Sequence, residues 1–186
     1  MKKLDQLPTL NDIRQTAGAI EDMIHRTPVM SSDNLNALSG ATIFFKCENF
    51  QKVGAFKMRG AASAALRLSD EERKRGLATH SSGNHAQAVA RAAQLQEVPA
   101  YIVMPIDAPA IKKAATEGYG ARIIFCQSTI EARETTLEEV VGETGATFIH
   151  PYNDYGVIAG QATAALELFE ETAPLDTVLA PIGGGG

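Results

Sequence analysis

From Leu77 to the end of the chain, short apolar runs alternate with longer segments that have the spacing of helices. The apolar runs are LATH (77–80), PAYIVMP (99–105), ARIIFC (121–126), ATFIH (146–150) and DTVLAPI (176–182). Each of the first four is followed by a segment long enough for a helix, and the connections are short. This alternation predicts a parallel sheet covered by helices on both faces. The expected fold class is therefore α/β.

The part of the chain before Leu77 is expected to be mainly helical. Thr9 followed by Asp12 indicates a helix start, although Asp12 stands where a capping box has Glu or Gln. The other predicted elements are a short helix after Ser32 or Asp33, a buried strand over TIFFKCE (42–48), a helix from about Ala55 to Leu68, and a short helix with a capping box at Ser69 and Glu72.

Three unusual loops follow predicted strands. They read SSGNH (81–85), HPYND (150–154) and GGGG (183–186). Ligands of parallel sheets bind beyond the carboxyl ends of the strands, so these loops are candidate binding segments. SSGNH begins a helix, whose free N–H groups attract carboxylate or phosphate, whereas the alternative is a plain helix cap by Ser82 or Asn84. The glycine run suits a phosphate, with a flexible tail as the alternative.

A lysine lies within the apolar stretch GAFKMRG (54–60). One stripe of the predicted helix consists of Lys57, Ala61, Ala64 and Leu68, and the opposite, solvated stripe consists of Arg59, Ser63 and Arg67. Lys57 is thus predicted to point inward and Arg59 outward. Burial and the helix macrodipole would both lower the pKa of Lys57, so that its amine could act as a nucleophile toward carbonyl compounds. The alternative is a lysine that extends its amine back to solvent.

Other function classes are disfavoured. The net charge is −5 and the basic residues are scattered, which argues against a nucleic-acid or anionic-membrane partner. No signal peptide or membrane-spanning run is predicted, and Cys47 and Cys126 read as reduced thiols of a cytoplasmic protein. No spacing of ligands resembles a metal site. A triad of Ser82, His85 and Asp154 lacks the G-x-S-x-G elbow.

Four segments occur in order with suitable spacing: FFKCENFQKVGAFKMRGA, SSGNHAQAVA, HPYNDYGVIAGQATAALE and APIGGGG. Together they resemble the serine/threonine dehydratase and serine racemase branch of the pyridoxal-phosphate enzymes, which have the two-lobed, tryptophan-synthase β-like fold (fold type II). The resemblance implies an incomplete large domain from residues 1–75 and 153–186 and a small domain from residues 76–152. Family members are longer, so the C-terminal part of the large domain is expected to be missing.

The resemblance also implies roles for individual residues. Lys57 would form a Schiff base with pyridoxal 5'-phosphate, Phe56 would pack against the pyridine ring, and Asn84 would bond to the phenolic oxygen. Ser82 would in addition be placed for proton transfer. The residues implied in binding the cofactor phosphate are Gly183, Gly184, Gly185 and Gly186, and those implied in holding the substrate carboxylate are Ser81, Ser82, Gly83, Asn84 and His85.

The activity implied is that of a dehydratase, or ammonia-lyase, which converts L-threonine or L-serine to a 2-oxo acid and ammonia. Serine racemase and threo-3-hydroxyaspartate ammonia-lyase are the alternatives, and a catalytically incompetent fragment or binding module is a further one. Ala55, where many relatives have serine, and Tyr152, where serine racemases have asparagine, argue against a dedicated racemase. The implied partners are a small amino-acid substrate and other copies of the chain in a dimer or tetramer, with a divalent cation possible in the missing part.

Overall fold

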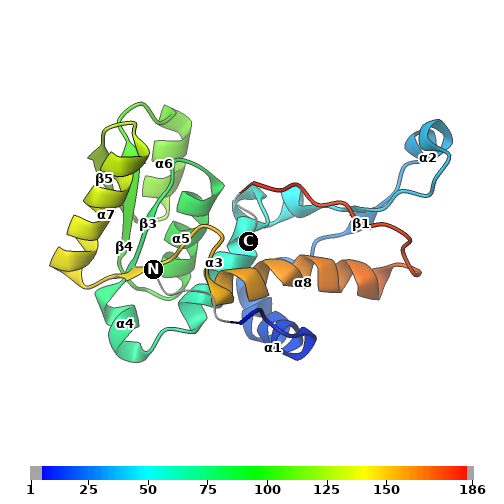
Figure 1. Ribbon diagram of the computed structural model, residues 1–186, viewed down its shortest axis with the longest axis horizontal. Helices are drawn as coiled ribbons and strands as arrows, with labels where there is room; N and C mark the ends of the chain where they lie inside the picture. The colour runs from blue at the N-terminus through cyan, green and yellow to red at the C-terminus, as the bar shows by residue number, and fades with distance from the viewer. Residues whose placement is uncertain (1–5, 184–186) are drawn as a thin grey trace.

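The computed structural model describes residues 6–183, and one end of it is built around a parallel sheet (Figure 1). The sheet has the strand order β5-β4-β3-β6, and every neighbouring pair is parallel. The strands are β3 (Leu77–His80), β4 (Ala100–Pro105), β5 (Arg122–Cys126) and β6 (Thr147–Phe148). These positions confirm the predicted α/β class and the first four apolar runs as strands.

Helices cover both faces of this sheet because its side chains alternate between two cores. Leu77, Ile102 and Met104 face α5, while Ala78 and Val103 face α7. The covering helices are α5 (Asn84–Leu95), α6 (Ala110–Gly118) and α7 (Ile130–Thr144). Apolar runs without internal polar alternation are what strands buried on both faces require.

The strand order places a topological switch point between β3 and β6. The chain proceeds from β3 to β4 to β5 in one direction, and then returns to add β6 on the other side of β3. Parallel sheets bind ligands at such a point, beyond the carboxyl ends of the two strands. The loops that leave β3 and β6 there are residues 81–83 and 149–154.

A second layer of helices packs beside the sheet. It contains α1 (Leu10–Ile20), α3 (Lys57–Leu66) and α8 (Tyr155–Glu171), while the short α4 (Asp70–Arg75) lies against β6. The capping boxes at Thr9 and Ser69 are both formed, and Asp12 takes the role that Glu or Gln usually has. The single-turn segments are η1 (Glu21–Met23), η2 (Glu48–Phe50) and η3 (Lys52–Gly54).

Helices α3 and α8 meet at two glycines. A Cβ atom at Gly160 would lie 2.7 Å from Gly60 Cα and closer still to the carbonyl oxygen of Arg59. A Cβ atom at Gly60 would lie 2.6 Å from the side-chain nitrogen of Gln161. The two backbones are therefore in direct contact, which only glycine permits at these positions. This contact fixes the start of α3 against α8.

A narrow arm extends from the helical layer, with α2 (Asp33–Ser39) at its tip (Figure 1). Its stem is the antiparallel pair β1 (Val29–Met30) and β2 (Phe45–Lys46). The strand expected over residues 42–48 is thus reduced to two residues. The strand expected over residues 176–182 is wrong within the described residues, because this segment pairs with no strand and leaves Val178, Leu179 and Ile182 exposed.

Among residues 6–183, no helix combines the length and the hydrophobicity needed to cross a membrane. The predicted division into two domains stays a prediction. The sheet and its covering helices are nevertheless continuous in sequence, from residue 77 to residue 148.

Candidate active site

Lys57 is the first residue of α3 and lies beside the switch point of the sheet. Its Nζ donates a hydrogen bond of 2.6 Å to the carbonyl oxygen of Pro151, in the loop that leaves β6. The same atom lies 5.2 Å from the centre of the Phe56 ring. The side chain is half-buried, and burial lowers the pKa of Lys57. The acceptor is an uncharged carbonyl group, so no negative charge offsets the cost of burying the ammonium form. The neutral amine is therefore favoured more than in an exposed lysine.

The loop after β3 presents free N–H groups to the same region. Ser81 N donates to Val103 O, and Ser81 Oγ accepts from Gly83 N at 3.2 Å. No side chain caps α5, so the predicted alternative of a plain cap by Ser82 or Asn84 is wrong. The first N–H groups of this 12-residue helix therefore have no partner within it and can bind an anion. Asn84 is exposed, and the Ser82 hydroxyl has no hydrogen bond within residues 6–183.

The His85 side chain turns away from this loop into the core. Its Nε2 lies 3.0 Å from Ile149 O. Because a carbonyl oxygen only accepts, the proton must be on Nε2, and the buried Nδ1 then has no partner in the described part of the chain. Burial, together with the positive charge of Lys57, lowers the pKa of His85 to about 4. Its imidazole is therefore neutral, and any contribution to carboxylate binding is limited to its backbone N–H.

The buried His85 makes stability depend on pH. The unfolded chain binds a proton near pH 6.5, whereas folded His85 does so only near pH 4. Stability is therefore lost as the pH falls below 6.5, and by linkage the loss between about pH 7 and about pH 5 is about 2 kcal/mol. Urea unfolding at both pH values measures it. His85→Asn should remove this part of the pH dependence, and a variant that keeps the wild-type slope would contradict the assignment.

The loop after β6 is closed by a second histidine. His150 Nδ1 accepts hydrogen bonds from the backbone N–H groups of Tyr152, at 3.2 Å, and Asn153, at 2.8 Å. The ring packs edge-on against Tyr152 and tilted against Phe148, with centroid distances of 4.5 and 5.5 Å. This turn holds Pro151, whose carbonyl accepts from Lys57.

Arg59 does not lie on a solvated face as predicted. Arg59 and Ser63 are both buried, and of the predicted outer stripe only Arg67 is exposed. The reason is that α1, α5 and α8 all pack against α3, so the helix has almost no solvent side. A helix of small residues on every side is the pattern of a buried helix, and KMRGAASAAL has it.

Two glutamates neutralise the buried Arg59. Glu48 accepts from Nε and Nη2 at 2.8 Å each, and Glu167 accepts from Nη1 at 2.7 Å and from Nη2 at 2.8 Å. Thr163 Oγ1 accepts a further bond from Nη1. Burial alone would raise the pKa of Glu167, but the bonds from Arg59 and Lys46 hold it below its usual value.

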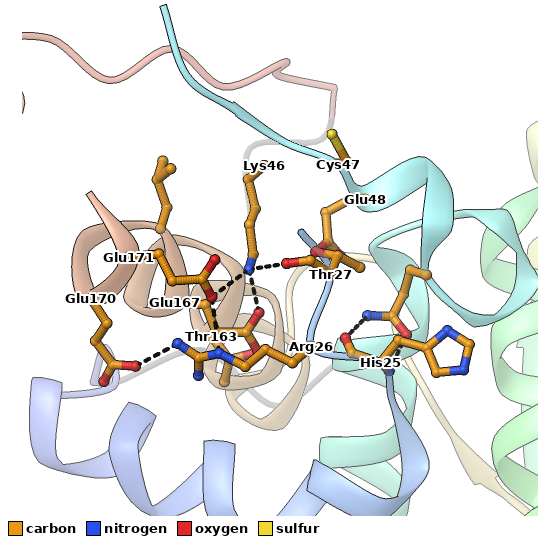
Figure 2. A network of polar contacts seen from close by, with 12 residues as sticks. His25, Arg26, Thr27, Lys46, Cys47, Glu48, Thr163, Glu167, Glu170 and Glu171 are labelled. Atoms are coloured by element: carbon orange, nitrogen blue, oxygen red, sulfur yellow. Dashed lines mark hydrogen bonds and ion pairs between the residues drawn. The ribbon is translucent and has the colours of Figure 1, made fainter. Parts of the chain in front are cut away.

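The network continues to the protein surface (Figure 2). Lys46 Nζ lies 2.7 Å from Glu167 and 3.3 Å from Glu171, and Arg26 pairs with Glu170 and Glu171. These contacts join the base of the arm, the start of α3 and the end of α8. The network thereby fixes the first turn of α3, on which Lys57 lies.

Two cations near the site were missed by the sequence analysis. A Cβ atom on Gly83 would lie 3.8 Å from Lys112 Nζ, so this amine lies over the loop after β3, and it has no ion pair or hydrogen bond within residues 6–183. Arg133, at the start of α7, acts on the pKa of His80 together with Glu134, and its buried Nε has no partner in the same range. The sequence offered one signal for Lys112 and Arg133: each lies in the helix that follows a predicted strand.

The predicted phosphate loop falls largely outside the described residues. Gly183 is exposed, and Gly184, Gly185 and Gly186 lie beyond the part of the chain that the structure describes. The site as described thus consists of a half-buried amine, an uncapped helix start and the turn at His150. Together they define an α/β protein with a partly desolvated lysine beside an uncapped helix start.

Comparison with known proteins agrees with this class. Residues 20–186 match the family model described as pyridoxal-phosphate dependent enzyme, and the chain belongs to this family. It is 51% identical over 180 residues to a β-hydroxyaspartate dehydratase of Paracoccus denitrificans. This alignment covers 97% of the chain and 57% of the relative. The chain is 47% identical over 178 residues to a serine racemase of Dictyostelium discoideum, which covers 96% of the chain and 55% of the relative.

A solved threonine deaminase from T.th. is also similar, with a TM-score of 0.82 and 44% identity over 88% of this chain and 52% of that one. The predicted α/β fold of type II and the predicted family are thereby confirmed. The chain spans somewhat more than half the length of the curated relatives it matches.

Pyridoxal 5'-phosphate is the cofactor of this family, and the described residues fit it. Its aldehyde reacts with a neutral amine, and the lysine predicted for this role, Lys57, has its pKa lowered by burial. The uncapped start of α5 supplies N–H groups for an anionic ligand. The roles predicted for Lys57, Phe56, Asn84 and Ser82 stay predictions, as do those of the loops at residues 81–85 and 183–186.

Proposed function

We propose that the chain belongs to an ammonia-lyase that acts on a small β-hydroxy amino acid with a second carboxylate, such as 3-hydroxyaspartate. The single observation that carries this proposal is the unpaired ammonium group of Lys112 beside Gly83. The relative with 51% identity, named for β-hydroxyaspartate, supports it. The comparisons thus favour the alternative over threonine as first substrate, since the threonine deaminase is less similar, at 44%.

The residues of the chain have separate tasks in this reaction. The bound cofactor supplies the electron sink that makes the α-proton of an amino acid removable. Lys57 Nζ, whose pKa is lowered by burial, accepts that proton. The N–H groups at the start of α5 hold the α-carboxylate. Loss of the β-hydroxyl as water, followed by hydrolysis, gives the 2-oxo acid and ammonia.

The substrate specificity follows from charge. A cation without a carboxylate partner is stabilised by a ligand that brings one, and a hydrogen bond between charged groups is worth roughly 1.5–3 kcal/mol. L-Serine and L-threonine offer only their α-carboxylate, whereas 3-hydroxyaspartate offers a second one to Lys112. Arg133 adds a further positive charge at the same edge of the sheet.

A second candidate is a serine racemase. Its support is the serine racemase relative with 47% identity and the Ser82 hydroxyl, which is free to transfer a proton. Release of ammonia without formation of D-serine would exclude this candidate.

A substitution at Lys112 tests the first candidate, the ammonia-lyase for 3-hydroxyaspartate. In the full-length protein, Lys112→Met should lower kcat/KM for threo-3-hydroxyaspartate by about tenfold or more, which corresponds to one lost charged hydrogen bond, and leave that for L-serine nearly unchanged. Formation of the 2-oxo acid measures both rates. Lys113→Met is the matched control, because Lys113 Nζ bonds to Ile106 O instead. Equal losses for both substrates would contradict the proposal.

A further inference from the structure

The carbonyl groups of residues 149 and 151 are bonded from opposite sides. Ile149 O lies 2.9 Å from Thr79 Oγ1 and 3.0 Å from His85 Nε2, both of which belong to the sheet and its helix α5. Pro151 O accepts from Lys57 Nζ, which belongs to α3. Between these two fixed oxygens lies His150. The direction of the Pro151 carbonyl therefore depends on the turn that follows Ile149.

That turn is held by one lone pair. His150 Nδ1 accepts from two consecutive N–H groups, those of Tyr152 and Asn153. Because both of these groups donate, Nδ1 carries no proton and the neutral ring has its proton on Nε2. A proton on Nδ1 would place a donor against two donors and open the turn. The ring position is meanwhile fixed by Phe148 and Tyr152.

We propose that His150 is a positioning residue for Lys57: its neutral imidazole caps the turn over residues 151–153 and so keeps the Pro151 carbonyl on the lysine amine. The proposal rests on Lys57 as the lysine that binds the cofactor. The fold and the lyase chemistry by themselves assign no role to the HPYND segment (150–154), and the proposal gives it one. While Lys57 carries no cofactor, its hydrogen bond to Pro151 O fixes the direction of its amine. Protonation of His150 removes this restraint.

The charged groups around His150 come from three elements. His80 at the end of β3, Lys57 at the start of α3 and Asp154 before α8 all act on it. Burial lowers the pKa of His150, His80 and Lys57 lower it further, and Asp154 opposes them. His80 in turn is influenced by Glu134 and Arg133 of α7. The ring is therefore neutral at pH 7 and gains its proton below its ordinary pKa of 6.5.

Two variants test separately the hydrogen-bond acceptor of His150 and its aromatic ring. His150→Asn keeps an acceptor, since an asparagine side chain bonds to the backbone N–H two residues further on. His150→Phe keeps an aromatic ring between Phe148 and Tyr152 but has no acceptor. The quantity to measure is the rate at which the apo-protein binds pyridoxal phosphate through Lys57, followed by the visible absorption of the lysine-bound cofactor from about pH 5 to about pH 9. Lys57→Ala is included throughout.

At pH 8 we expect His150→Asn to bind the cofactor at the wild-type rate and His150→Phe to be slower by about tenfold or more, because His150→Phe loses both hydrogen bonds that Nδ1 accepts. Below pH 6.5 the wild-type rate should fall more steeply with pH than the rate of His150→Asn, because only the wild type loses its cap there. A wild-type rate and pH profile in His150→Phe would overturn the proposal.

A measurement on the wild type alone provides a second test. The nitrogen chemical shifts of His150 should show an unprotonated Nδ1 at pH 7, and a proton on Nδ1 would overturn the proposal even if His150→Phe does not fold. If Lys57→Ala still shows the absorption band, the proposed function fails instead. The two failures are therefore distinguishable.

Discussion

Replacing Lys57 with alanine is expected to abolish the visible absorption band that pyridoxal phosphate acquires when it is joined to a lysine. The reason is the environment of its amine, which is desolvated and bonded to a carbonyl group rather than to a carboxylate. Lys46, in contrast, is bonded to Glu167 and Glu171. An amine held in an ion pair is protonated and is a poor nucleophile.

The measurement is an absorption spectrum of the full-length protein after addition of the cofactor and removal of the excess. Lys52→Ala is the matched control, since Lys52 lies in the same segment and its Nζ bonds to Asp22 O at the surface. This variant should keep the band. Borohydride reduction followed by peptide mass analysis should place the modification on Lys57, and its location on another lysine would refute the assignment.

Replacing Arg59 with alanine is expected to destabilise the protein by about 3–5 kcal/mol, the cost of removing one partner of a buried ion pair. Arg59 has no exposed side-chain surface, and the Glu167 side chain is 6% exposed. Without the guanidinium group, Glu48 and Glu167 would keep their negative charges close together and out of water. The loss is large compared with a typical folding free energy of roughly 5–15 kcal/mol.

Urea unfolding of the wild type and the variant measures this difference. Arg73→Ala is the control, because Arg73 also pairs with an acidic residue, Asp70, but the Asp70 side chain is 85% exposed. Such surface pairs contribute about 0–1 kcal/mol. If Arg59→Ala lost no more stability than Arg73→Ala, the buried network would not have this stabilising role.

The alternation of strands and helices could be predicted from the sequence because each element carries its own local signal. LATH, PAYIVMP and ARIIFC are apolar without alternation, and this pattern marks strands buried on both faces. The run at residues 176–182 has a similar composition, yet it forms no strand. A strand needs a neighbour to bond to, and composition does not provide one.

The site was predictable only in part, because its contacts join distant residues. The periodicity of α3 correctly predicted that Lys57 points toward the interior. It could not show that other helices also cover the opposite side of α3. Arg59 and Glu167 are 108 residues apart, and Lys57 and Pro151 are 94 apart. The tautomer of His150 likewise follows from hydrogen bonds of the folded turn.

The contact between Gly60 and Gly160 has a consequence for motion. Since the two backbones touch, α3 and α8 cannot slide along each other without a collision of main-chain atoms. They behave as one rigid piece, and Lys57 is fixed to it. A rotation of the sheet against this piece would leave Lys57 stationary and carry Ser82 with β3. Such a rotation would bend the chain after Ile149, whose carbonyl is bonded to the sheet side. Closure around a substrate would then bring the loop that is predicted to hold the carboxylate to the lysine, and not the lysine to the loop.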